Sequence, residues 1–574
     1  MIRLRLAATA ARGRFETLET RLVLSAASLA DISLVAHGTL EEGGCSCGCC
    51  STCTGGHAHD DHLHGVDAYG NEYHAIPLVD FNRLSLNNYP DLHQPVKLEG
   101  LAETFHLHSN SGASKTIFLD FTGYTTSGTY WNSSFNNGND IVTAAYDFDG
   151  NISFSDTELE RIQRIWQRVA EDFAPFDVNV TTADPGTDDL RNTGGADSEW
   201  GIRVVIGGNG SWYGSAGGVA YLTSFTWSTD TPVFVFEDNL GNGHERYTAE
   251  AISHEVGHAL GLSHDGTSSV GYYTGHGSGE TGWAPIMGVG YYQQLTQWSQ
   301  GEYDDADNSQ DDLSIIVSNN GFGYRADDHG DANGSASWLT TDGINVSGEG
   351  LIEQNTDVDV LAFATTGGNV NLSFDEAAIG ANLDIGVELY NASNQLVASS
   401  NPTNELGASL NLNLDAGEYY IHITGVGKGD PSTTGYSDYG SLGQYSISGT
   451  VDGLVDVDAT GSSALEGPAG FAVDATDSGE LDDVFSLNHF AGAHASSDLR
   501  FDQAHVLPAD NSHQFILQSN SVLYRTAAHA IFTAAGETGT SSHSWREWDE
   551  VDAGDWNALA ATADELAWLD WDRA

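Results

Sequence analysis

The feature that most constrains this chain is the stretch HEVGHALGLSHD, from His254 to Asp265. His254 and His258 stand four residues apart, so on a helix their side chains project from one face and can share a metal ion. The apolar stripe of this predicted helix consists of Ile252, Val256, Ala259 and Leu260. Because the two histidines point roughly opposite to that stripe, we expect them to face a cleft or solvent.

The third histidine of the stretch requires the helix to end first. In a continuing helix, His264 would lie about 9 Å along the axis from His258, too far to bind the same ion. Gly261 can adopt a positive φ and turn the chain back. Three imidazoles at about 2.0–2.1 Å form an open zinc site with a fourth position for water. Glu255, beside the first ligand, is placed to accept a proton from that water.

These fixed positions resemble the zinc-binding sequence of the metzincin metallopeptidases, and among them the matrixin- and reprolysin-like bacterial branches. The resemblance implies an α/β catalytic domain with a twisted mixed sheet and a zinc helix. It also implies zinc on His254, His258 and His264, with Glu255 as general base. The family carries a methionine turn beneath the metal, and APIMG, with Met287, matches it. The alternative is a chance arrangement of polar residues, against which five fixed positions argue.

The order of the predicted elements between Ser114 and Tyr324 fits the same family. Strands are predicted at Lys115–Phe121, Phe176–Thr182, Ile202–Gly208, Gly217–Phe225 and Pro232–Phe236, and helices at Leu159–Phe173, behind a capping box at Ser155–Glu158, and from Asp311. By resemblance, Gly217–Phe225 is the antiparallel edge strand that pairs with substrate main chain; an ordinary strand is the alternative.

The glycine-rich segment after His264 is expected to form one wall of the cleft. Within it, His276 is either a second metal ligand or a loop histidine without a role. Some relatives have a tyrosine two residues after the methionine, where this chain has Val289. The first tyrosines beyond it are Tyr291 and Tyr292, so no tyrosine is assigned to the reaction.

The net charge of the chain limits the classes of molecule that it is expected to bind. The chain of 574 residues has 81 acidic and 20 basic residues, for a net charge of −61. This balance argues against nucleic acid and anionic membranes, and favours solubility, calcium binding or a saline environment. No apolar run is long enough to span a membrane. Protein or peptide substrates fit, and the oligomeric state is not indicated.

The first 112 residues are expected to serve export and maturation. Residues 1–27 resemble the leader of large exported bacterial proteins, through LETRLVLSA. Residues 28–112 are interpreted as a pro-region, which contains all five cysteines, between Cys45 and Cys53, and then His57, His59, His62 and His64. Three interpretations stay open for this tract: a soft-metal cluster, a cysteine that caps the catalytic zinc, and a flexible segment.

Two further regions follow the predicted peptidase domain at 113–326. Residues 327–452 alternate with period two and resemble the bacterial pre-peptidase C-terminal domain, an all-β sandwich, through Asp357-Val358-Asp359 and LDAGEYYIHI. Its Asp and Asn loops suit structural Ca²⁺, with ligands not identified. Residues 453–574 resemble no known family; the terminal DWNALAATADELAWLDWDRA predicts an acidic helix that either docks on the body or binds a partner.

Together these observations predict a secreted zinc metalloendopeptidase with several domains. In this interpretation, Zn²⁺ on three histidines activates a water and Glu255 moves its proton. The alternative is an extracellular binding or adhesion protein with an inert peptidase module. The retained Glu255 argues against that alternative.

Overall fold

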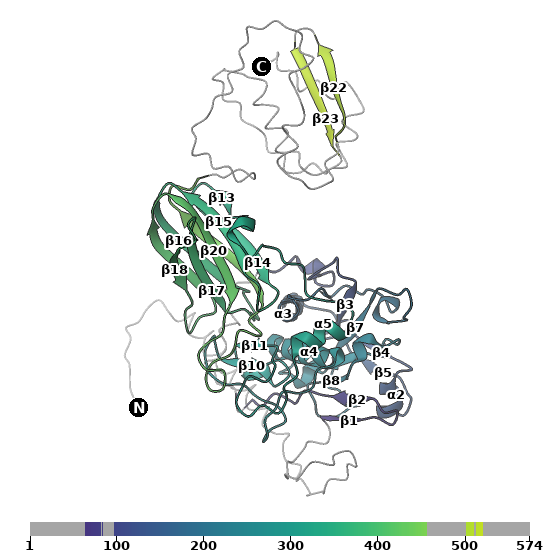
Figure 1. Ribbon diagram of the computed structural model, residues 1–574. Coiled ribbons are helices and arrows are strands. Elements are labelled where there is room, and N and C mark those ends of the chain that lie inside the picture. Colours follow the sequence, from purple (N-terminus) through teal and green to yellow (C-terminus); the bar gives the residue numbers. More distant parts are fainter. Residues whose placement is uncertain (1–62, 82, 84–96, 456–500, 510–511, 520–574) are drawn as a thin grey trace, which may run out of the picture. The chain divides into compact units, whose positions relative to one another are not determined.

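The computed structural model describes residues 63–81, 83, 97–455, 501–509 and 512–519 (Figure 1). The predicted leader, the cysteine tract and the tryptophan-containing tail lie outside these residues. The chain divides into two units, residues 1–60 and 61–574, and everything described here belongs to the second. The described part is multidomain and mostly β, with several sheets and few helices.

The first large sheet has seven strands in the order β1-β2-β8-β9-β7-β3-β6. Their bounds are β1 His64–Val66, β2 Glu72–His74, β3 Lys115–Asp120, β6 Asn179–Thr181, β7 Trp200–Ile206, β8 Gly218–Tyr221 and β9 Val233–Val235. The four consecutive strands β9, β7, β3 and β6 are parallel, and β6 is an edge of the sheet. They are buried almost throughout, as runs rich in Ile, Val and Phe predict.

The edge of this sheet differs from the prediction. The expected strand within Gly217–Phe225 is β8, and it runs antiparallel to β9 as predicted. It is not an edge strand, however, because β2 pairs antiparallel with its other side and β1 pairs with β2. The sequence analysis did not predict this hairpin, whose two strands have only three residues each.

Two long helices form the core with the sheet. Helix α3 (Asp156–Asp172) begins with the predicted capping box, in which Ser155 N donates to Glu158 Oε2 at 2.7 Å. Helix α4 (Glu245–Leu260) packs against α3 and against β8 and β9. It ends at Gly261, whose φ of +107° confirms the predicted reversal. The other α-helices of the described residues are α2 (Tyr130–Phe135) and α5 (Asp312–Asn319), and α5 begins next to Asp311, where a helix start is predicted.

Short elements complete this part of the chain. Two small sheets pair β4 (Tyr124–Thr126) with β5 (Ile141–Thr143), and β10 (Trp283–Pro285) with β11 (Leu295–Gln297). The 3-10 turns are Leu101–Glu103, Asp188–Leu190, Ser224–Thr226, Glu237–Asn239, Gly290–Tyr292 and Asn333–Ser335.

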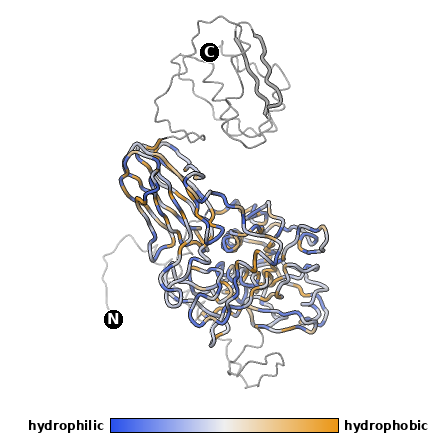
Figure 2. Tube along the Cα trace, viewed as in Figure 1, coloured by the Kyte–Doolittle hydropathy of each residue, from blue (hydrophilic) through white to orange (hydrophobic). Residues whose placement is uncertain are grey.

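Downstream lies a sandwich of two five-stranded sheets, ordered β12-β15-β20-β17-β18 and β13-β14-β21-β16-β19. The bounds are β12 Ser337–Trp338, β13 Thr340–Asp342, β14 Asn345–Ile352, β15 Asp359–Thr365, β16 Gly368–Glu376, β17 Ile385–Asn391, β18 Leu396–Ser400, β19 Ala408–Leu414, β20 Gly417–Gly425 and β21 Gly443–Val451. Hydrophobic and hydrophilic positions alternate along many of these strands, as the period of two predicts (Figure 2). Beyond it, β22 (Phe501–Ala509) pairs with β23 (Ser512–Ser519).

Buried polar contacts join the sandwich to the two long helices. The Asp172 carboxylate, at the end of α3, accepts hydrogen bonds from Ser253 on α4 and from Asn382, which precedes β17. Glu171 accepts two hydrogen bonds from Gln444 of β21, at 2.9 and 2.7 Å. Burial raises the pKa of Glu171 to about 7. The sandwich is therefore bonded directly to α3 and, through Asp172 and Ser253, indirectly to α4, the helix that carries the first two histidines.

Within the described ranges, no helix has the length and apolar character needed to cross a bilayer.

Candidate metal centre

The structure brings the three predicted histidines together. His254 and His258 lie on successive turns of α4 and are fully buried. Gly261 then reverses the chain so that His264 returns toward them. The Nε2 atom of His258 lies 3.0 Å from Nε2 of His254 and 3.0 Å from Nε2 of His264.

The hydrogen bonds of the rings indicate what these nitrogens hold. The Nδ1 atoms of His254 and His258 lie 2.9 and 2.7 Å from the carbonyl oxygens of Ile286 and Leu262. A carbonyl oxygen only accepts hydrogen bonds, so each Nδ1 must carry the ring proton. In a neutral ring, the Nε2 atom then carries a lone pair.

Protonation of the imidazole rings, which would remove the repulsion between their Nε2 lone pairs, is disfavoured at this site. Burial lowers the pKa of His254 to about 4 and, together with the neighbouring imidazoles, lowers the pKa of His258 well below its usual value. Lone pairs facing each other at 3.0 Å repel, and a cation between them removes the repulsion. Ligand nitrogens about a tetrahedral zinc lie about 3.3 Å apart, given bonds of about 2.0–2.1 Å. The donor set therefore fits Zn²⁺, with two Nδ1 atoms oriented by backbone carbonyls.

Glu255 lies beside these ligands and is fully buried. Its Oε1 accepts a hydrogen bond from the backbone N–H of Ile76 at 2.7 Å. Its Oε2 is buried and has no hydrogen-bond partner among the described residues. Burial raises the pKa of this carboxyl well above its usual value. A Cβ at Gly218 would meet Cγ of Glu255 at 2.8 Å, so the glycine of β8 lets the strand approach the carboxylate.

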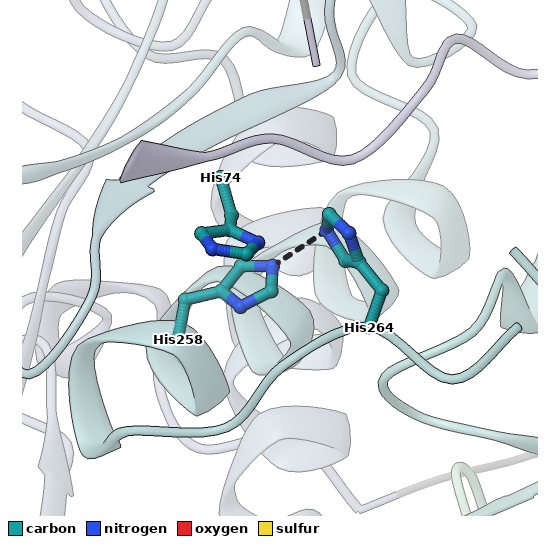
Figure 3. Close-up of side chains that lie close together, drawn as sticks. All are labelled: His74, His258 and His264. Carbon is teal, nitrogen blue, oxygen red and sulfur yellow. Dashed lines mark hydrogen bonds between the residues drawn. The ribbon is translucent and has the colours of Figure 1, made fainter. Parts of the chain in front are cut away.

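A fourth imidazole, which sequence reasoning missed, lies at the same place. His74 ends β2 and is 6% exposed. Its ring centroid lies 4.7 Å from that of His258 and 4.8 Å from that of His264. Figure 3 shows the three rings converging from a strand, a helix and a loop. One nitrogen from each lies within 4.8 Å of the other two, so these three could also hold a metal ion.

The two nitrogens of His74 differ in their surroundings. Nε2 lies 3.0 Å from Oε1 of Glu72, whereas Nδ1 is buried and lacks a hydrogen-bond partner within the described part of the chain. Burial lowers the pKa of His74. A sequence signal existed: HGV and EYH flank the turn residues DAYGN, which is typical of a hairpin.

We expected the histidine face of α4 to point into a cleft or into solvent. It does not point into solvent, because both histidines are buried. Nearly every residue of α4 is buried. The reason is the β1–β2 hairpin, which carries His74 and the buried Ala75 and Ile76 onto this face. An apolar stripe on one side of a helix does not reveal a second segment that covers the other side.

Met287 packs on α4 as the predicted methionine turn requires. It is fully buried, and a Cβ at Gly257 would collide with its sulfur. Gly257 lies between Glu255 and His258, so the methionine contacts α4 directly below the site. The turn is fixed to the third-ligand loop by a hydrogen bond from Asp265 N to Met287 O at 2.9 Å.

The tyrosine nearest the histidines is Tyr272, which the sequence did not single out. Its ring centroid lies 4.4 Å from that of His264, and its hydroxyl donates to the Ala75 carbonyl at 2.7 Å. Tyr291 donates to the Pro77 carbonyl at 3.2 Å, and Tyr292 accepts from the N–H of Asp80 at 2.8 Å.

His276 lies in contacts of a different kind. One ring nitrogen meets the Tyr273 hydroxyl at 2.7 Å and the other meets the carbonyl oxygen of Gly435, near the sandwich, at 2.6 Å. Both nitrogens are engaged, so His276 links two segments of the chain and is not available as a metal ligand in this arrangement.

Carboxylates form further candidate sites at the start of the sandwich. Asp327, Asp331 and Asp357 converge, as do Asp327, Asp328 and Asp359. Oδ1 of Asp359 is buried without a hydrogen-bond partner in the described ranges, and the side chain of Glu353 lies against Asp357. Burial raises the pKa of Glu353 to about 9 and that of Asp359 to about 8. Such an oxygen-rich group, in which Asp359 is buried and the other aspartates are exposed or half-buried, suits Ca²⁺. A smaller group, formed by Asp147, Asp149 and Glu158, lies before α3.

Comparisons with known proteins give little beyond this geometry. No protein-family model matches the chain, and no curated protein matches it. Among solved structures, the pre-peptidase C-terminal domain of collagenase from Bacillus anthracis is similar, with 17% sequence identity and a TM-score of 0.15. The match covers 20% of this chain and 91% of that one.

Proposed function

We propose that this chain is a secreted zinc endopeptidase of the metzincin type. The observation that carries the proposal is the convergence of three imidazole Nε2 atoms beside the buried Glu255 carboxylate. In peptidases with this residue pattern, such a group hydrolyses peptide bonds through a metal-bound water. The downstream sandwich is proposed to belong to the pre-peptidase C-terminal type.

His254, His258 and His264 would hold the zinc, which when bound lowers the pKa of a water and polarises the scissile carbonyl. Glu255 acts as general base toward that water and returns the proton to the leaving amine. Its burial suits this role, because a carboxyl with a raised pKa holds a proton more readily between the two steps. The backbone carbonyls of Ile286 and Leu262 keep His254 and His258 in the tautomer that presents Nε2.

The main chain of β8 and its flanks provides a place for an extended peptide. The N–H of Gly217 donates to the Ile76 carbonyl at 2.8 Å, and the N–H of Leu222 donates to the Glu72 carbonyl at 3.0 Å. Strand addition of this kind uses backbone hydrogen bonds and tolerates many sequences. A substrate that took the place of β2 would therefore be bound antiparallel to β8, across the histidines.

The test is hydrolysis of a quenched-fluorescent peptide library by the full chain, before and after limited proteolysis, with Glu255→Gln treated identically. We expect Glu255→Gln to keep its zinc and its melting temperature while losing about 10²–10⁴-fold in kcat/KM. Equal turnover by both proteins would refute the assigned base. Zinc content below one ion per chain in the wild type would refute the metal centre.

An extracellular binding or adhesion protein with an inert peptidase module is the rival function. An inert module has no need to keep the general base, and here Glu255 stands fully buried beside the ligands. Casein hydrolysis that 1,10-phenanthroline abolishes and zinc restores would exclude this rival.

A further inference from the structure

We infer that the segment His64–Asp80 is an internal inhibitor of the proposed peptidase and that His74 is a fourth ligand of its zinc. The inference rests on the proposed function, which it deepens by assigning a residue and a regulatory state to the same site. The segment belongs to the region that the sequence analysis interpreted as a pro-region.

The first support is the arrangement of the imidazole nitrogens of His74, His258 and His264. His258 and His264 each present a nitrogen within 4.8 Å of one on His74, and the His74 ring is 6% exposed. Its Nε2 is held by Glu72, which leaves Nδ1 as a lone pair buried without a partner in the described ranges. An unpaired acceptor in a desolvated site is unfavourable unless it binds something, and a cation shared with the other imidazoles satisfies it.

The second support is the main chain of the segment, which lies where a substrate would lie. Residues Tyr73 and His74 pair antiparallel with Tyr221 and Ala220 of β8. Beyond β2, the Ile76 carbonyl accepts from the N–H of Gly217 at 2.8 Å. The segment thus uses the backbone donors and acceptors that strand addition by a peptide would need.

The third support is the state of the general base. The N–H of Ile76 donates to Oε1 of Glu255 at 2.7 Å, so the segment itself occupies one oxygen of this carboxylate. The hydroxyl of Tyr272 is likewise occupied, by the Ala75 carbonyl at 2.7 Å.

With His74 as fourth ligand, a bound zinc would have four protein ligands and no water, as in structural zinc sites. The open site forms only when the segment leaves. His74 therefore takes the role that the sequence analysis considered for a cysteine between Cys45 and Cys53, a tract outside the described residues.

The experiment uses the full chain with Co²⁺ in place of zinc and acetohydroxamate as a probe of the fourth position. We expect the visible Co²⁺ spectrum of the wild type to change little with acetohydroxamate. In His74→Ala the probe should bind at least about tenfold more tightly, because no internal ligand competes with it. Val66→Ala, which truncates an exposed side chain on the same hairpin, is the control and should behave as wild type.

X-ray absorption of the wild type gives a second measurement that needs no variant: four imidazole ligands are expected, and three with a water would overturn the inference. Equal acetohydroxamate affinities in the wild type and His74→Ala, with cobalt bound to both, would overturn the inference and leave the proposed function standing. A wild type that binds neither metal would overturn both. If His74→Ala does not fold, His74→Gln takes its place in the titration.

Discussion

Truncation of Ile76 tests how the hairpin is held against β8. This side chain is 1% exposed and packs in the main hydrophobic core. Removing its three outer carbons by Ile76→Ala should weaken the docked state by about 3 kcal/mol, through lost transfer energy and the cavity left behind. Since about 1.4 kcal/mol corresponds to a factor of ten, the undocked population should rise on the order of a hundredfold.

The assay is native-state hydrogen exchange of the amides of Gly217 and Leu222. These N–H groups donate to the carbonyls of Ile76 and Glu72, so they exchange when the hairpin leaves. We expect both to exchange about a hundredfold faster in Ile76→Ala, while amides within β3 keep their protection.

Val66→Ala is the matched control, because Val66 lies on the same hairpin, is β-branched and is 60% exposed. It should change stability by less than about 0.5 kcal/mol and leave the exchange of Gly217 and Leu222 unaltered. Unchanged exchange in Ile76→Ala would refute the reasoning. So would an equal acceleration within β3, because the hairpin would then unfold only with the whole sheet.

Three further predictions follow from the site and its surroundings. Tyr272→Phe removes the hydroxyl that donates to the Ala75 carbonyl, and kcat for peptide hydrolysis should fall about a hundredfold with KM nearly unchanged. An equal kcat in the variant would show that the hydroxyl does not act in the transition state. Calcium at a hundredfold excess over its Kd should stabilise the wild type by about 2.7 kcal/mol in thermal unfolding, and Asp359→Asn should abolish most of that gain; a calcium effect of the same size in Asp359→Asn would rule out this site. Burial raises the pKa of Glu237 to about 8, so the folded state holds its proton more tightly than the unfolded state. The resulting stability is fully present below about pH 4.5 and is lost at about 1.4 kcal/mol per pH unit up to about pH 8. Glu237→Gln should remove that slope in urea unfolding, whereas an unchanged slope would assign the pH dependence to other groups.

Local sequence patterns predicted much of the fold. The alternation of strands after Ser335 corresponds to the strands of the sandwich, and the capping box at Ser155 begins α3. Gly261 ends α4 with the positive φ that its position required. Each of these signals depends on residues close together in the chain, where periodicity and backbone preference decide the outcome.

The missed residues depend on contacts between distant segments. His74 meets His258 across 184 residues of sequence, and neither strand of its hairpin exceeds three residues. Tyr272 lies in a glycine-rich loop, where no periodicity indicates which side chain turns toward the histidines. The sequence predicted that β8 would lie at the edge of the sheet, and only the long-range pairing with β2 shows that it does not.

Hydrogen bonds link the sandwich to α3 and, through Asp172, to α4. These bonds affect whether the sandwich can be exchanged for another domain during evolution. Asn382 reaches Asp172, which in turn reaches Ser253, the residue before His254. Burial, together with the nearby Glu250, raises the pKa of Asp172 to about 8. Detaching the sandwich would leave the Asp172 carboxyl group, which is bonded to the residue before His254, without its amide donor. Gene fusions that exchange this trailing module for another would have to supply an equivalent amide, so the two parts are expected to have diverged as a pair.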